Sequence, residues 1–126
     1  YAELTDDELR LEVARRCGWT WANELPYMEL LRSETGLLGA SRSTGKTEVQ
    51  FERTLPDWTH KLPAAIALLE STGAEYNFGK RITGTPKPVY DVIIWGYYSA
   101  FGDDYEAEGD TLPRAACEAW LMWKDA

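Results

Sequence analysis

The chain has 126 residues, and its 21 acidic and 13 basic side chains give a net charge of −8 at neutral pH. This length is usual for a single domain, and a hydrophobic content of 44% is typical of a globular protein rather than a disordered one. The chain lacks the basic excess with which proteins neutralise phosphates, so the composition argues against long DNA or RNA as a partner. Six tryptophans and seven tyrosines are compatible with a homodimer, because aromatic side chains serve interfaces as well as cores.

Cys17 and Cys117 lie far apart, each within an expected apolar helical stripe. We therefore predict two buried free thiols, with a disulfide between the terminal helices as the alternative. The sequence shows no signal-peptide pattern and no apolar run of about 18 residues, so we expect a cytoplasmic protein without a membrane partner.

The first helix is predicted over residues 5–17. Thr5 and Glu8 have the spacing of a capping box, Leu9 and Val13 begin an apolar stripe, and Gly18 ends the helix. Residues 19–34 leave two interpretations open, because Pro26 excludes a continuous helix and residues 27–32 could form a helical turn or an extended segment. Residues 36–47 are rich in Gly, Ser and Thr and predict a flexible loop.

The rest of the chain predicts strands and two more helices. Residues 48–53 alternate as a half-buried strand does, and residues 62–69 carry a helical stripe capped by Asp57 or Thr59. Strands are predicted over residues 74–82, 89–98 and 105–108. The centre of 89–98 is apolar on both faces, which favours a central strand with helices on both sides. Thr111 or Asp110 can cap the last helix, with Pro113 in its first turn.

These elements predict an α+β fold. We expect one α-β-α sandwich domain over residues 1–126, in which a mostly antiparallel sheet of about four strands has helices on both faces.

Two patterns resemble catalytic motifs and lack their context. Residues 40–47 fit a loose phosphate-loop pattern, but an alternating strand follows the lysine where a helix should begin. His60 has Asp57 nearby but no nucleophile, and a histidine in a first helical turn is the simpler interpretation. We therefore assign no catalytic residue and no cofactor.

An acidic run precedes the last helix. Alternation along a strand places its carboxylates on one face, which could meet a basic partner protein or hold a hard cation. Metal ligands converge from several elements, whereas a row along a strand diverges, so no metal site is assigned. The candidate partner-binding residues are Asp103, Asp104, Glu106 and Glu108.

Cations and aromatic rings could together bind a small nucleotide through charge-assisted hydrogen bonds and stacking. The candidate ligand-binding residues are Arg42, Lys46, Trp58, Lys80, Arg81, Lys87 and Trp95.

Three patches resemble the phage ABA sandwich domain family, a group of small phage-encoded proteins. They are the charged first helix ending at Gly18 and Trp19, the segment 56–69, and, most specifically, residues 106–119 with Asp110, Thr111 and Leu112. The resemblance covers about half of the chain. It implies the α-β-α layered fold and a phage accessory role, and it implies no reaction.

The sequence therefore favours a non-enzymatic phage accessory protein in the host cell, acting against host defence. It would bind either a host defence protein or that system's small nucleotide signal. The alternatives are an acidic mimic of nucleic acid that inhibits a host protein, and a metal-dependent phosphohydrolase that uses the acidic strand.

Overall fold

The structure is a computed structural model that describes residues 1–82, 84, 86–95 and 104–126. Its contacts divide the chain into two compact units. We call residues 11–56 the four-stranded unit, and residues 1–10 with 57–126 the three-stranded unit. Helix α1 (Asp6–Arg16) begins in the three-stranded unit and ends in the four-stranded unit.

The α+β class with antiparallel pairing is confirmed, but the strands form two sheets where the sequence predicted one. The larger sheet has the order β1-β2-β3-β4, and the smaller has the order β5-β6-β7. All pairs within both sheets are antiparallel.

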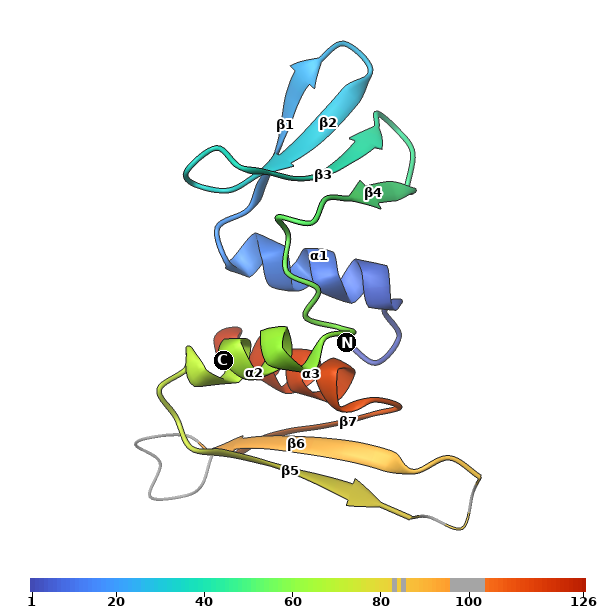
Figure 1. The fold of residues 1–126 in the computed structure, drawn as a ribbon, viewed down its shortest axis with the longest axis vertical. Helices are drawn as coiled ribbons and strands as arrows, with labels where there is room; N and C mark the ends of the chain where they lie inside the picture. The colour runs from blue at the N-terminus through green and yellow to red at the C-terminus, as the bar shows by residue number, and fades with distance from the viewer. Residues whose placement is uncertain (83, 85, 96–103) are drawn as a thin grey trace. The chain divides into compact units, whose positions relative to one another are not determined.

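The four-stranded unit consists of consecutive hairpins (Figure 1). Its strands are β1 (Thr20–Leu25), β2 (Met28–Arg32), β3 (Leu38–Ser43) and β4 (Val49–Phe51). The first hairpin turns at Pro26 and Tyr27, so the extended alternative for residues 27–32 is correct, while the preceding strand was not predicted.

The segment 36–47, predicted to be a flexible loop, contains β3. Its small residues allow close packing rather than mobility: a Cβ added at Gly39 would lie 2.5 Å from Cζ3 of the Trp19 ring. Both Gly39 and Trp19 are buried, so the glycine in this strand marks the place where an aromatic ring approaches the backbone.

The three-stranded unit places helices over its sheet (Figure 1). Its elements are α2 (Leu62–Glu70), β5 (Tyr76–Arg81), β6 (Val89–Trp95), β7 (Asp104–Gly109) and α3 (Leu112–Lys124). Helix α3 packs on β6 and β7, and α2 packs on α3. Val92 and Ile94 of β6 are fully buried, and the positions that alternate with them are not.

The prediction of helices on both faces of β6 is not met in the described part of this unit. The face carrying Asp91, Ile93 and Trp95 has no described helix packed on it. We call this surface the open face. Residues 96–98, predicted to continue the strand, lie outside the described residues.

The helix ends follow their capping chemistry, with one exception. The Thr5 and Glu8 backbone N–H groups donate to each other's side chains at 3.0 and 3.2 Å, which confirms the capping box. The Arg114 N–H donates to Thr111 Oγ1 at 3.3 Å, which confirms the cap of α3. The predicted cap of α2 is wrong, because Lys61 is its N-cap and no side chain accepts there.

Neither Cys17 nor Cys117 forms a disulfide, and only Cys117 is buried. The prediction that Cys17 is buried is wrong. Helix α1 ends at Arg16, so Cys17 lies in the turn before Gly18 and not on the buried stripe of the helix. No helix in the described residues has the length and apolar character needed to cross a bilayer.

Candidate functional site

The open face of the three-stranded unit carries a row of carboxylates. Asp104, Glu106 and Glu108 are exposed and alternate with half-buried residues along β7. Asp91 of β6 lies directly opposite Glu108 in the register, and directly opposite residues project from the same face of a sheet. We call these four residues the acidic row. Because β7 is an edge strand, a partner can approach the row from the face and from the side.

Among the residues that the structure describes, Arg81 is the basic side chain on the open face. Its guanidinium forms ion pairs with Glu108 and with Asp91, the latter at 3.4 Å. Four carboxylates and one guanidinium leave this part of the surface with a net charge of −3. Asp104 and Glu106 have no ion pair among the described residues, so the uncompensated charge lies at that end of the row.

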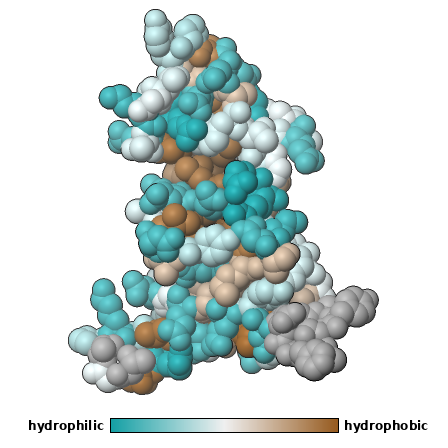
Figure 2. Space-filling view, turned by 180° about the vertical axis from the view of Figure 1, so that it is seen from behind, coloured by the Kyte–Doolittle hydropathy of each residue, from teal (hydrophilic) through white to brown (hydrophobic). Residues whose placement is uncertain are grey.

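Apolar side chains lie beside the acidic row. Ile93 is opposite Glu106 and Trp95 is opposite Asp104, and 36% of Trp95 is exposed. Gly79 leaves a shallow hollow of about 140 Å³ between β5 and β6, and Asp91 reaches over it. Figure 2 shows the region of this sheet mostly in hydrophilic colours, with small hydrophobic patches between them. An apolar centre with a charged border is the composition of a protein interface.

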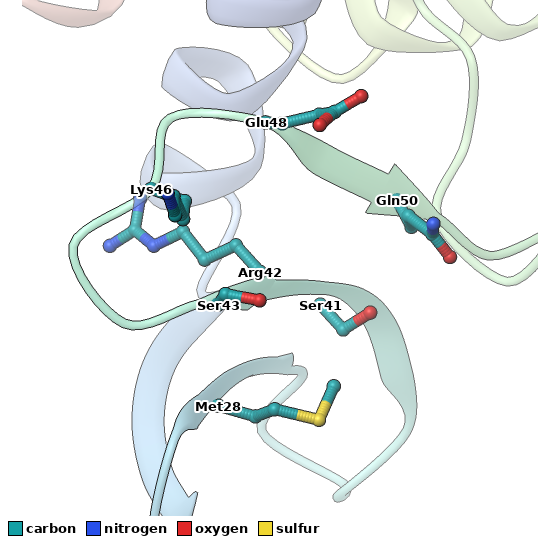
Figure 3. Close-up of a pocket in the computed structure, with 7 residues that line it drawn as sticks. All are labelled: Met28, Ser41, Arg42, Ser43, Lys46, Glu48 and Gln50. Atoms are coloured by element: carbon teal, nitrogen blue, oxygen red, sulfur yellow. The ribbon is translucent and has the colours of Figure 1, made fainter.

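The four-stranded unit has a second candidate site, a polar hollow of about 390 Å³ (Figure 3). Ser41 and Ser43 of β3 lie between Arg42 and Lys46 on one side and Glu48 and Gln50 on the other, and Met28 completes the lining. The side chains of Ser41, Ser43, Gln50 and Lys46 make no hydrogen bond or ion pair within the described residues. The hollow thus presents two hydroxyls, an amide and an ammonium group.

Arg42 is held within its sheet. Its guanidinium donates to Glu29 Oε2 at 2.7 and 3.2 Å and lies 3.9 Å from the centre of the Trp21 ring. The ion pair neutralises its charge and the ring contact orients it. Lys46 is therefore the cation at this hollow that is open to a ligand.

The predicted ligand-binding residues do not form one site. Arg42 and Lys46 line the hollow of the four-stranded unit, whereas the other five belong to the three-stranded unit. There, Trp58 is buried in the core. Lys80 and Arg81 lie at the end of β5, Lys87 follows in the turn, and Trp95 lies at the far end of β6.

The predicted partner-binding residues stay together. Asp104, Glu106 and Glu108 share the open face, and Asp103 lies outside the described residues. Sequence reasoning missed Asp91 and Ile93, which belong to the same surface. The signal was present in the alternation of β6, where an aspartate interrupts an apolar strand.

His60 is engaged at both ring nitrogens. Nδ1 lies 2.9 Å from Asp57 Oδ1, and Nε2 lies 3.1 Å from Asp6 Oδ2. The hydrogen bond to Asp57 is the largest cause of the raised pKa of His60. Burial opposes it, and the charges of Asp57 and Asp6 add to the increase. A general base needs a free nitrogen directed at a substrate. This geometry is that of a structural ion pair.

The described residues contain no group of three or more His, Cys, Asp or Glu side chains arranged to hold a metal ion. Within the acidic row, Asp91 and Glu108 converge on Arg81, while Glu106 and Asp104 lie farther along β7. The described residues therefore contain no cluster of metal ligands of the kind that a metal-dependent phosphohydrolase would need. Residues 40–47 comprise the end of β3 and the turn after it, and the next element is the strand β4, so the phosphate-loop pattern lacks its helix.

Comparison with protein-family models, with curated proteins and with solved structures finds no match to this chain. The resemblance to the phage ABA sandwich domain family therefore rests on the sequence patches alone.

Proposed function

We propose that this chain is a non-enzymatic binding protein that docks on a positively charged partner protein through the acidic row. The observation that supports this most is the open face itself. It combines four carboxylates, a single described counter-charge, the exposed Trp95 and the half-buried Ile93 on a surface that no described helix covers. Complementary charge steers association and sets specificity, and the apolar centre supplies buried area.

The spacing of the row supports mimicry of nucleic acid. Alternate residues of a strand are about 6.8 Å apart, which is about twice the rise per phosphate along the axis of a DNA double helix, counted for one strand. The spacing of the carboxylates would therefore match every second phosphate position on a basic surface that binds a phosphate backbone. The resemblance of residues 106–119 to a phage family supports a setting in which a phage accessory protein occupies such a surface on a host defence protein.

Calorimetric titration with a decalysine peptide tests the proposal. Wild-type protein should bind, with an affinity that falls steeply as salt rises. The variant Asp104→Asn/Glu106→Gln/Glu108→Gln should lose at least about tenfold in affinity, because each exposed charge contributes modestly and three are removed. Glu34→Gln/Glu48→Gln/Glu52→Gln is the matched control, since it removes the same charge from exposed positions in the other unit. If both variants lose the same affinity for decalysine, binding depends on net charge alone and the proposal is refuted.

The second candidate function is capture of a small nucleotide signal at the polar hollow. It is supported by Lys46 and the nearby hydroxyl and amide groups, which make no hydrogen bond or ion pair within the described residues. The described residues that line the hollow include no aromatic ring, so recognition would depend on the phosphate groups rather than on base stacking. Cyclic and NAD-derived nucleotides should then raise the melting temperature of the wild type and of Lys61→Ala, but not that of Lys46→Ala. A panel without any shift in the wild type would remove this candidate.

A further inference from the structure

A buried carboxylate lies beside the acidic row. Glu118 of α3 is 4% exposed and is flanked by the fully buried Cys117 and Ala119. It borders a cavity of about 300 Å³, whose other lining residues are Tyr1, Ala2, Glu106, Ala107, Glu108 and Met122. The volume is at the lower end of the range for small-ligand sites.

The charge of Glu118 is poorly compensated inside the described structure. Its Oε1 is buried and accepts no hydrogen bond. The ion-pair partner is Arg114, whose Nη2 is 3.6 Å away and thus beyond hydrogen-bond distance. Arg114 is already committed, since it donates to Asp6 at 2.7 Å and to the Leu4 carbonyl at 2.5 Å. Burial raises the pKa of Glu118, and Arg114 and the charge of the N-terminal ammonium group oppose this.

The cavity suits a cation on an apolar stem. Ala2, Ala107 and Met122 offer apolar walls for methylene groups, and Glu118 offers an unpaired acceptor for an ammonium N–H. An ammonium group is compact and can donate to one oxygen, whereas the planar guanidinium fork is suited to two oxygens presented together. The geometry therefore favours lysine over arginine.

The cavity lies against β7 on the side of α3, and Glu106 and Glu108 of the acidic row are part of its lining. We propose that the cavity receives a lysine side chain of the basic partner, whose ammonium group pairs with Glu118. This inference rests on the proposed function and adds the residue type that the partner presents.

The test compares decalysine with decaarginine by calorimetry. Wild-type protein should prefer decalysine. Glu118→Gln should weaken decalysine binding by about tenfold, the loss expected for one charge-assisted hydrogen bond, and leave decaarginine binding unchanged. Glu75→Gln is the matched control, because it removes an exposed acid outside the row and the cavity. Ala107→Met is a second variant that fills the cavity and keeps the acid, and it should have the same effect as Glu118→Gln.

The outcomes separate this inference from the proposed function. If decalysine and decaarginine bind equally and Glu118→Gln behaves as Glu75→Gln does, the lysine site is refuted while docking on the acidic row stands. If neither peptide binds, both are refuted. The melting temperature of each variant shows that the comparison is made on folded protein.

Discussion

Arg114 Nη1 lies 2.7 Å from Oδ1 of Asp6 and joins α3 to the first turn of α1. The Nη2 of the same guanidinium donates to the carbonyls of Ala2 at 3.3 Å and Leu4 at 2.5 Å. One side chain thus fixes the segment that lines the Glu118 cavity. The Arg114 side chain is only 15% exposed, and its bonds to Asp6 and to the Leu4 carbonyl are partly buried.

Arg114→Ala should lower the free energy of unfolding by about 2–4 kcal/mol, because it leaves main-chain carbonyls and the Asp6 carboxylate without their donor and Glu118 without its ion-pair partner. Urea denaturation measures this loss. Arg15→Ala is the control. The Arg15 side chain is 65% exposed, so its ion pair with Glu12 should contribute less than about 1 kcal/mol to the free energy of unfolding. Equal effects of the two substitutions would contradict the role given to Arg114.

Gly39→Val should destabilise the four-stranded unit by about 1–3 kcal/mol, because the new Cβ would overlap the Trp19 ring or displace it. Ser41→Val places the same side chain on the same face of β3, beside the polar hollow, and should be nearly neutral. Chemical denaturation followed by tryptophan fluorescence compares the two. A neutral Gly39→Val would mean that Trp19 does not pack on this strand.

The melting temperature should depend on pH through His60. The carboxylates of Asp57 and Asp6 raise its pKa in the folded state, so protonated His60 stabilises the fold. This contribution is complete below the unfolded pKa of about 6.5, and it is lost as the pH rises through the folded pKa. The difference in melting temperature between wild type and His60→Gln should therefore shrink from mildly acidic to alkaline pH. A difference that stays constant across this range would rule out the ion pairs of His60.

The thiols should differ in reactivity. Cys17 is exposed, whereas Cys117 is buried and burial raises the pKa of its thiol. A thiol reagent should modify one equivalent rapidly in the native protein and a second only after denaturation. Two fast equivalents in the native state would show that the packing of α3 is wrong.

Local signals in the sequence predicted the elements that are stabilised locally. The capping box at Thr5 and Glu8 and the cap at Thr111 each depend on a residue three positions away. Both partners of each hydrogen bond therefore lie within one short sequence motif. The alternation of β7 likewise placed Asp104, Glu106 and Glu108 on one face without knowledge of the rest of the sheet.

Features that depend on distant residues could not be predicted in the same way. The Gly, Ser and Thr content of residues 36–47 is typical of a loop, but β3 pairs with β2 and β4, and Gly39 lies against the ring of Trp19, twenty positions earlier. Glu118 was not predicted as a site residue, because the sequence does not show that a cavity lies beside this acidic residue of an apolar helix. The division into two sheets depends on which hairpins pair, and alternation within a strand contains no information on that choice.

The most direct test of the proposed docking surface is to map a decalysine peptide on isotope-labelled protein by NMR. We predict chemical-shift changes at Asp91, Ile93, the Trp95 indole and residues 104–108, which weaken as salt is added. The acidic residues of the four-stranded unit, such as Glu24 and Glu52, should remain unaffected. Changes that are confined to that unit, or spread evenly over all acidic residues, would contradict the assignment of the acidic row as the binding surface.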